Sequence, residues 1–232
     1  MKKLIFYLSV GFLFSFLTSC NYFEGLFDDD DGYSLNDAWV GYGMVDKDEA
    51  ANTFTIELDN GALLIPMSSS GWNNQVADNQ RVLVNFTILD DKEDELPTDE
   101  QYYVRINSLR KVLYKGILEI TPAIEDSIGN DPIHVKKQWT KDHMLNFELQ
   151  YRGGNTTHYI NLVRQPDTTG DEPIVLELRH NANDDSQMYN LSAVVTFDLS
   201  SLQVAGQDSV TYRIVAKDYD GSDYGYNGVY KY

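Results

Sequence analysis

The sequence predicts an all-β protein with two domains, a small closed barrel followed by an antiparallel β-sandwich. Two observations carry this prediction. Apolar and polar residues alternate with a period of two along most of the mature chain, as they do in half-buried strands. Short clusters of Gly, Pro, Asn and Asp separate these runs and are typical of turns. No mature segment of helical length has the apolar spacing of an amphipathic helix.

Residues 37–118 form the predicted barrel domain. Alternating runs occur at residues 54–58, 82–88 and 102–106. The sequence Asp-Asn-Gly at 59–61 is a tight hairpin signal, because Gly tolerates the positive φ that such turns require. Gly41 and Gly43 interrupt an apolar run, as in bulged or sharply curved strands. Four or five curved strands in about 80 residues fit a small closed barrel.

Residues 119–232 form the predicted sandwich domain. Its first part contains Pro122, Gly129 and Pro132, which break regular structure. Alternating runs then occur at residues 145–151, 160–162, 174–178, 191–199 and 210–216. The sequence RGGNTT at 152–157 predicts a hairpin between the first two runs. About six or seven short strands with turns at this spacing are typical of an antiparallel sandwich.

Residues 1–19 have the pattern of an export signal. Lys2 and Lys3 supply the positive start, residues 4–17 are almost wholly apolar, and two small polar residues precede Cys20. A charged start, a short apolar core and a small-residue end define a secretory signal. The apolar run is shorter than the roughly 20 residues that a membrane-spanning helix needs.

The sequence Leu-Thr-Ser-Cys at 17–20 resembles the cleavage box of bacterial lipoprotein signal peptides. The resemblance implies that Cys20 becomes the acylated first residue of the mature protein. It also implies an exported outer-membrane lipoprotein, facing the periplasm or exposed on the cell surface. The alternative is a buried or free thiol after ordinary cleavage. A disulfide within the chain is excluded, because Cys20 is the only cysteine.

Residues 20–36 form a predicted acidic tether next to the lipid. Four consecutive aspartates at 28–31 repel one another and favour a solvated segment. Calcium binding fits this segment less well, because Phe27 stands where the loop pattern needs an acid. Acidic residues after the lipidated cysteine also resemble the surface-export signal of Bacteroides-group lipoproteins, so the membrane face stays open.

The charge of the mature chain excludes some partners. Removal of residues 1–19 leaves 16 basic and 36 acidic side chains, a net charge of −20. Such a charge favours solubility and repels nucleic acids and anionic membrane surfaces. The barrel domain carries seven acids and one lysine between Asp90 and Glu100. We therefore expect no nucleic-acid partner, although small barrels elsewhere bind oligonucleotides.

Three segments together resemble the NigD-like lipoproteins of the Bacteroides group. They are LNDAWVGYGMV at 35–45, TFTIELDNGALLIPM at 53–67 and LRHNANDDSQMYNLSAVVTFDLSSL at 178–202. The resemblance covers essentially the whole mature chain. It implies an N-terminal OB-type barrel and a C-terminal β-sandwich, in agreement with the two blocks above. It implies no established activity.

The densest polar cluster of the chain, HNANDD, is the candidate ligand site. Its candidate residues are His180, Asn181, Asn183, Asp184 and Asp185. The alternative is a turn, in which Asn and Asp side chains satisfy the local backbone. The four histidines form no zinc spacing with one another or with nearby acids. We expect no catalytic residue, no metal site and no cofactor.

Two further segments could contact a partner. Residues 134–143 place three lysines around Trp139, which could bind an acidic partner or a glycan. The alternative is an exposed strand with one core tryptophan. Residues 218–228 are rich in Tyr and Asp and resemble a calcium-binding turn without its terminal glutamate. They also fit a tyrosine-rich hairpin, whose rings could stack on sugars.

These observations predict a non-catalytic, lipid-anchored envelope protein that binds or assists another envelope component, a protein or a glycan. The alternative is a glycan- or ion-binding accessory lipoprotein. An enzyme is a third and weaker hypothesis. A catalytic pair of carboxylates needs one member that is desolvated, so that its pKa is raised, whereas the run of acids at 90–100 is expected to be solvated. A desolvated acid or histidine in a deep pocket would favour the enzyme, and aromatic rings flanked by polar groups would favour glycan binding.

We predict that Cys20→Ala releases the mature protein from the membrane or leaves its precursor unprocessed. One acyl chain holds a protein at a membrane only marginally, whereas two or three hold it stably. The measurement is fractionation of cells, with the mass of the protein in each fraction. A Cys20→Ala chain that is fully processed and still membrane-bound would contradict the lipoprotein assignment.

Overall fold

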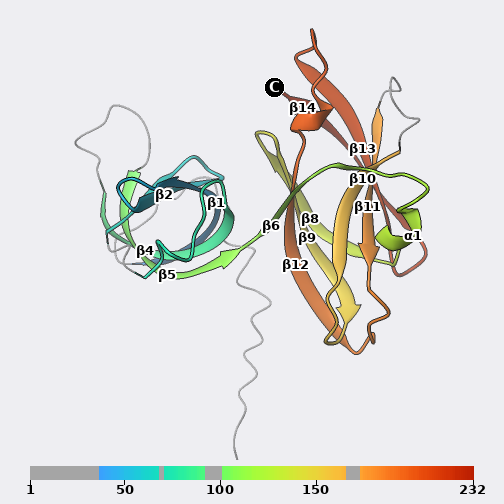
Figure 1. Ribbon diagram of the computed structural model, residues 1–232, viewed down its shortest axis with the longest axis horizontal. Coiled ribbons are helices and arrows are strands. Elements are labelled where there is room, and N and C mark those ends of the chain that lie inside the picture. Colours follow the sequence, from blue (N-terminus) through green and yellow to red (C-terminus); the bar gives the residue numbers. More distant parts are fainter. Residues whose placement is uncertain (1–36, 68–70, 92–100, 166–172) are drawn as a thin grey trace, which may run out of the picture. The chain divides into compact units, whose positions relative to one another are not determined.

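The computed structural model describes residues 37–67, 71–91, 101–165 and 173–232. These residues form strands β1–β14, one short α-helix and one turn of 3₁₀ helix, which confirms the all-β prediction (Figure 1). No helix among them has the length and apolar character needed to cross a bilayer. The predicted signal peptide at 1–19, Cys20 and the tether at 20–36 lie outside the described residues.

The first five strands close into a barrel. They are β1 (Ala38–Asp48), β2 (Thr53–Leu58), β3 (Leu63–Pro66), β4 (Arg81–Asp91) and β5 (Gln101–Lys111). The spatial order is β1-β2-β3-β5-β4, and pairing of β1 with both β2 and β4 completes the closure. All pairs are antiparallel except β3 with β5. This order and closure confirm the predicted OB-type barrel.

Alternation along each strand fills the barrel interior. Fully buried side chains include Ile56, Leu64, Val82, Val84, Phe86, Ile88 and Val104. Gly43 lies where β1 begins to pair with both neighbours, and a Cβ there would come within 2.6 Å of the Glu57 carbonyl oxygen. The register of β1 is nevertheless unbroken. The irregularities lie instead between β4 and β5, near Asn85 and Ile88.

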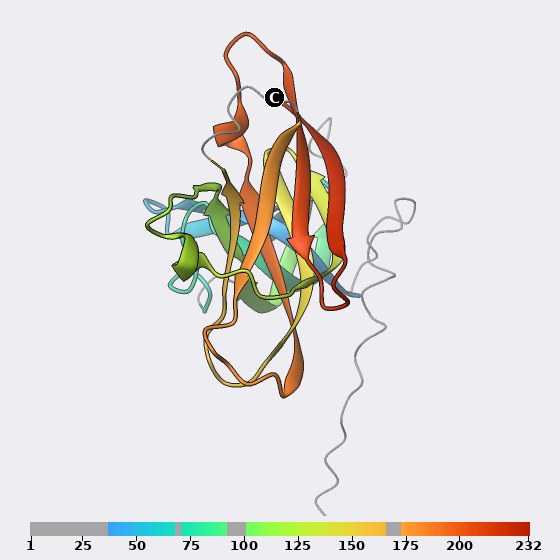
Figure 2. The ribbon, with the colours of Figure 1, turned by 90° about the vertical axis from the view of Figure 1, so that its right-hand side faces the viewer.

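Nine strands form two packed sheets (Figures 1 and 2). The five-stranded sheet has the order β14 (Asp223–Lys231), β13 (Ser209–Lys217), β11 (Ile174–Asn181), β10 (Tyr159–Arg164) and β7 (Leu118–Glu119). The four-stranded sheet has the order β6 (Leu113–Gly116), β12 (Tyr189–Asp198), β9 (Met144–Gly153) and β8 (His134–Lys141). Four pairs are antiparallel and three are parallel, namely β7 with β10, β11 with β13 and β6 with β12. Strand β6 and the first residue of β7 thus lie before residue 119, where the sequence placed the start of this domain.

The sandwich core lies between these two sheets. Its fully buried residues include Leu145, Phe147, Leu149, Leu162, Leu176, Phe197, Leu199 and Ile214. Phe147 and Phe197 meet edge to face, with ring centroids 6.1 Å apart. Outside the sheets, the segment around Pro122 and Gly129 contains α1 (Glu125–Ile128), and the 3₁₀ turn η2 (Ser200–Leu202) follows β12.

The predicted hairpin at RGGNTT is wrong, because β9 and β10 belong to different sheets. β9 pairs with β8 and β12, whereas β10 pairs with β11 and β7. Gly153 lies at the crossing, where a Cβ would come within 2.8 Å of Leu191 and 2.9 Å of the His158 ring. The glycines therefore permit close packing at a crossover between sheets. A glycine-rich sequence is compatible with a hairpin within one sheet and with a crossover between two sheets.

Several strands begin or end at the same end of the sandwich, which we call the loop end. Gly153 at the end of β9 pairs with Tyr189 at the start of β12. Tyr159 at the start of β10 pairs with Asn181 at the end of β11. β13 runs parallel to β11 and finishes at this end too. The loop end therefore gathers the connections 154–158, 182–188 and 218–222.

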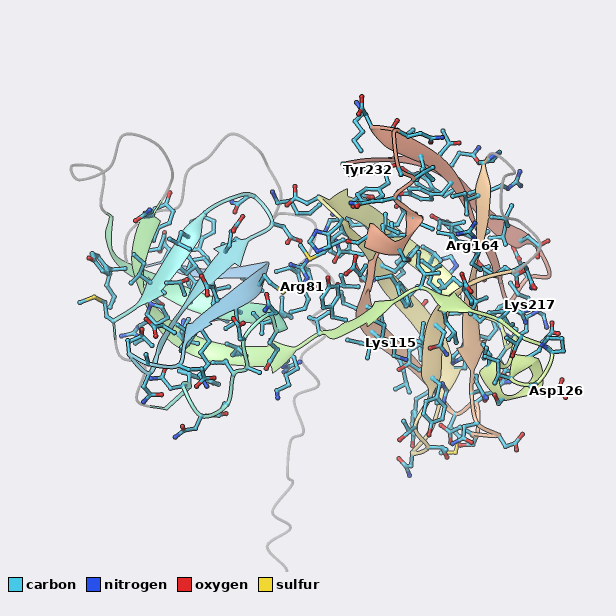
Figure 3. The ribbon with its side chains drawn as sticks, turned by 45° about the horizontal axis from the view of Figure 1, so that its top comes forward. Arg81, Lys115, Asp126, Arg164, Lys217 and Tyr232 are labelled. Carbon is cyan, nitrogen blue, oxygen red and sulfur yellow. The ribbon has the colours of Figure 1, made fainter. Side chains whose placement is uncertain are left out.

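A buried ion pair of the barrel, between Arg81 (labelled in Figure 3) and Asp59, also makes hydrogen bonds to the four-stranded sheet. The Arg81 guanidinium, wholly inaccessible to solvent, donates to both carboxylate oxygens of Asp59 at 2.5 Å. It also donates to Asn146 Oδ1 at 3.0 Å, and Trp139 Nε1 donates to Asp59 Oδ2 at 3.2 Å. Val112 alone separates β5 from β6, and its N–H donates to the Arg81 carbonyl oxygen at 2.9 Å.

The hairpin predicted at 59–61 is confirmed, and its glycine is conformationally required. Gly61 has a φ of +94°, and the Leu58 N–H donates to the Ala62 carbonyl oxygen across the turn at 2.8 Å. No atom lies within 4 Å of a Cβ built on Gly61, so the constraint is the backbone and not space. This turn presents Asp59 to Arg81.

We predict that Gly61→Val lowers the free energy of unfolding by roughly 1–3 kcal/mol, because a β-branched residue is strained at positive φ. The measurement is urea denaturation of the mature chain. Gly116→Val is the matched control, because Gly116 has equal space and no positive φ. An equal effect of both substitutions would contradict the argument from φ.

Candidate functional site

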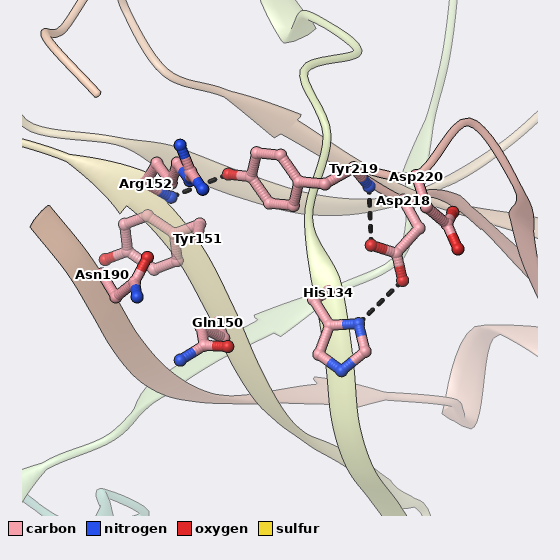
Figure 4. A pocket seen from close by; sticks show the side chains of 8 residues that line it. All are labelled: His134, Gln150, Tyr151, Arg152, Asn190, Asp218, Tyr219 and Asp220. Atoms are coloured by element: carbon pink, nitrogen blue, oxygen red, sulfur yellow. Dashed lines mark hydrogen bonds and ion pairs between the residues drawn. The ribbon is translucent and has the colours of Figure 1, made fainter. Parts of the chain in front are cut away.

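A pocket of about 420 Å³ opens at the loop end of the sandwich (Figure 4). Four elements line this loop-end pocket. Its lining residues are His134 from β8, Gln150, Tyr151 and Arg152 from β9, Asn190 from β12, and Asp218, Tyr219 and Asp220 from the turn after β13. Its volume lies within the range of small-molecule sites.

Strand register places the polar side chains next to one another. Gln150 lies opposite His134, and Arg152 lies opposite Asn190. Gln150 and Arg152 are two residues apart in β9, so both point to the same face of the sheet. Two amides, a guanidinium and an imidazole therefore share one surface, although they come from three segments of the sequence.

The turn at 218–222 forms the opposite wall of the pocket. Asp218 Oδ2 lies 2.7 Å from His134 Nδ1, and Asp218 Oδ1 accepts the Tyr219 N–H at 2.6 Å. Asp220 Oδ1 accepts from the N–H and the hydroxyl of Ser222, and these hydrogen bonds lower the pKa of Asp220. The acids of this turn are thus engaged by their own loop and by His134. The described residues contain no grouping of three or more His, Cys, Asp or Glu that could hold a metal ion.

Two tyrosines give the pocket its aromatic surface. Tyr219 is 39% exposed, and its hydroxyl oxygen accepts the Arg152 backbone N–H at 2.7 Å. The Arg152 guanidinium lies 6.0 Å from the centre of the Tyr219 ring, a distance at which cation–π attraction operates. Tyr151 is half-buried, packs against the sandwich core and also lines the pocket. Burial raises the pKa of the Tyr151 hydroxyl.

Behind Tyr151 lies a buried chain of polar groups, which we call the histidine relay. The Tyr151 ring centre is 4.9 Å from that of His158 and 5.2 Å from that of His180. His180 Nδ1 lies 3.1 Å from the Pro132 carbonyl oxygen, and His180 Nε2 lies 2.8 Å from His158 Nδ1. His158 Nε2 lies 3.1 Å from Asp185 Oδ2.

The hydrogen-bond partners identify donors in the relay. A carbonyl oxygen only accepts, so His180 Nδ1 donates to the Pro132 carbonyl oxygen. A carboxylate also only accepts, so His158 Nε2 carries a proton as well. His158 and Asp185 thus form the end of a chain of contacts that begins at the Pro132 carbonyl oxygen. The two side chains are only 3% and 5% exposed.

Two pKa shifts agree with this assignment. Burial lowers the pKa of His180, and the nearby His158 lowers it further. The Gly154 N–H lowers the pKa of Asp185 most, and hydrogen bonds from His158, Thr156 and Ser186 add to that effect. His180 is therefore neutral and Asp185 is ionised.

The structure separates the five candidate residues of the HNANDD cluster. His180 and Asp185 belong to the relay, behind the pocket wall. Asn183 and Asp184 have positive φ values of 53° and 56°, and the Asn183 N–H donates to Asn181 Oδ1. These three residues thus lie in a turn, from which Asn181 also donates to the Ser127 carbonyl oxygen at 2.7 Å.

Sequence reasoning missed His158 and most of the pocket. His158 precedes β10, and its partners are 22 and 27 positions away in the sequence. Trp139 does not join the pocket. Its ring packs 5.4 Å from that of Tyr42, and its Nε1 donates to Asp59. Only His134, at the start of that basic segment, reaches the pocket.

Two family models match the chain, one for each domain. Residues 42–112 match the NigD-like N-terminal OB domain, and residues 116–227 match the NigD-like C-terminal beta sandwich domain. These matches agree with the closed barrel and the two packed sheets. Among curated proteins, none matches this sequence.

Solved structures of similar proteins include three from the genera Parabacteroides and Bacteroides. A protein of Parabacteroides distasonis, provisionally described as toxin-related, is 33% identical, with a TM-score of 0.70 over 84% of this chain and 94% of its own. A NigD-like immunity protein of Bacteroides caccae is 20% identical, with a TM-score of 0.62 over 87% and 99%. A Bacteroides fragilis protein, provisionally described as a lipoprotein, is 15% identical, with a TM-score of 0.60 over 84% and 98%. The last two comparisons show a shared fold.

The relay makes the stability of the fold depend on pH. His180 is neutral in the folded protein, whereas the unfolded chain binds a proton there below the ordinary pKa of 6.5. The free energy of unfolding should therefore fall as the pH decreases through 6.5. The slope approaches about 1.4 kcal/mol per pH unit for one proton. Asp185, with its lowered pKa, adds a further loss as the pH falls below 3.8.

We predict that His180→Gln flattens this slope between pH 6.5 and about 5, because it removes the group that titrates on unfolding. Urea denaturation at a series of pH values measures the slope. His134→Gln is the matched control, since it removes an imidazole whose side chain is 49% exposed, and it should retain the slope. A His180→Gln chain with the wild-type slope would refute the assignment of a neutral His180.

Proposed function

Because the chain belongs to the NigD-like family, we propose that it is an accessory protein of the cell envelope, lipid-anchored at Cys20, which binds another envelope component and catalyses no reaction. The lipoprotein-like signal sequence supports the anchor and the location. The description of the Bacteroides fragilis relative as a provisional lipoprotein points the same way. The family supports an accessory and non-enzymatic role.

The loop-end pocket supports a glycan as the bound component. Gln150, Asn190 and Arg152 offer amide and guanidinium groups that match the hydroxyls of a sugar. Tyr219 adds an exposed ring on which the C–H face of a sugar can stack. The convergence of these groups around one cavity is the observation that carries the proposal.

The histidine relay is desolvated, as a catalytic group often is, but its connections argue against catalysis. A nucleophilic mechanism needs a histidine nitrogen that can take a proton from a hydroxyl or thiol. His180 uses its two nitrogens on Pro132 and His158, and His158 uses its second nitrogen on Asp185. No ring nitrogen is left for a nucleophile. We therefore assign the relay a structural role in holding the pocket wall.

Ion binding is the weaker alternative for this pocket. Asp218 is paired with His134, and Asp220 is engaged by Ser222, so neither acid is arranged with others around a cation. A saccharide needs no such arrangement of carboxylates. It exchanges its water hydrogen bonds for those of amide and guanidinium groups, and the sugar ring covers the aromatic surface.

We predict that neutral oligosaccharides bind the mature Cys20→Ala chain, and that Arg152→Ala and Tyr219→Ala each weaken binding about tenfold, equivalent to about 1.4 kcal/mol. Isothermal titration with a panel of oligosaccharides measures the affinity. Tyr159→Ala is the matched control, because Tyr159 is 50% exposed but does not line the pocket. Failure of the whole panel to bind, or an equal loss in Tyr159→Ala, would reject the glycan assignment.

A further inference from the structure

The two sandwich sheets end in four edge strands, which differ in how they are protected. A strand at a sheet edge presents unpaired N–H and C=O groups that can template pairing with another chain. Natural proteins protect such edges with short strands, bulges or charged side chains. The edges here are β14 and β7 in one sheet, and β6 and β8 in the other.

Three of these edges carry one of the protective features. β7 has two residues and β6 has four, so each offers few backbone groups. β8 is longer, but its register with β9 shifts between Val135 and Lys137. It also carries three lysines, at 136, 137 and 141. Lysines and a bulge both hinder the approach of another strand.

Strand β14 is neither short nor bulged, and its charged side chains stand only at its two ends. It spans nine residues, Asp223–Lys231, and its register with β13 is continuous from end to end. It contains no proline, and no charged residue lies between Asp223 and Lys231. Within the described parts of the chain, β13 is its only partner strand. β14 is therefore a long, unprotected edge.

The direction of the β14 backbone groups follows from one hydrogen bond. The Tyr232 N–H donates to the Asp208 carbonyl oxygen at 3.0 Å, so even-numbered residues direct their backbone groups toward β13. Odd-numbered residues then direct theirs outward, because the pattern alternates along an antiparallel pair. Gly225, Asn227 and Val229 are such residues, and all three are exposed.

We propose that β14 is a dimerisation edge, which pairs antiparallel with β14 of a second copy of this chain. Centred on Asn227, this pairing places Asp223 of one protomer opposite Lys231 of the other, at both ends of the interface. It also places the outward-directed N–H and C=O groups of one copy opposite those of the other. Parallel pairing would place Asp opposite Asp and Lys opposite Lys, which is unfavourable.

The side chains of the edge are also complementary to themselves. In this register the exposed Val229 faces Gly225 of the second copy, so a branched side chain meets a residue with none. A two-fold interface requires such self-complementarity, because each residue meets its counterpart twice. A register shifted by two residues would leave Asp223 and Lys231 of both protomers without a counterpart of opposite charge. The charges therefore select a second copy in this register over an unrelated extended peptide.

Sedimentation velocity of the mature Cys20→Ala chain, from about 5 to 500 μM, tests this proposal. The proposed dimer goes beyond the proposed function and does not depend on it. We expect a reversible monomer–dimer equilibrium. Amide exchange at residues 225, 227 and 229 should slow as the concentration rises. Asn227→Pro removes an outward N–H that β13 does not use and should weaken the dimer at least tenfold.

The charge pairs supply a second test, which does not rely on a proline. Asp223→Lys alone should weaken the dimer, and Asp223→Lys combined with Lys231→Asp should restore it, because the double exchange recreates the pairs in reverse. A chain that stays monomeric at 500 μM would overturn the proposal. So would a dimer that Asn227→Pro leaves unchanged, or a double exchange that fails to restore association. Monomeric chains that instead bind an unrelated extended peptide at β14 would overturn it as well.

Discussion

The ion pair between Arg81 and Asp59 is the interaction on which the arrangement of the two domains depends. A buried guanidinium is strongly destabilising without its carboxylate, so Asp59 has to stay at the β2–β3 turn. Asn146 extends the network from Arg81 to the four-stranded sheet, and its Oδ1 also accepts the Thr196 hydroxyl at 2.7 Å. One charge thus links a barrel hairpin with β9 and β12. The same two strands carry pocket residues at the loop end.

Much of the fold was predictable because burial acts on every second residue of a strand. Val82, Val84, Phe86 and Ile88 alternate in the sequence and are all fully buried. Gly61 was predictable for a different reason, since a tight turn restricts φ locally. The crossover after β9 was not predictable. Gly153 is needed because Leu191 and His158 pack against it, and both contacts arise only after the two sheets have formed.

The candidate site was predictable only in part, because the sheets assemble it from separated segments. The sequence singled out residues 134–143, 180–185 and 218–228 as polar or aromatic segments. It gave no reason to combine them. Strand direction places the start of β8 and the ends of β11 and β13 at one end of the sandwich. The contacts of His180 with Pro132 and of His158 with Asp185 join residues that no local spacing connects.

The single-residue connection at Val112 has a consequence for the evolution of this architecture. Domains that are joined by long linkers can be exchanged between genes as independent modules. Here Val112 bonds to the backbone of Arg81, the residue that also holds Asn146 in the sandwich. An insertion next to Val112 would move Asn146 Oδ1 away from the Arg81 guanidinium and leave a buried polar contact unsatisfied. Selection should therefore keep barrel and sandwich together as one heritable unit, and variation in length should accumulate in the loops of each domain.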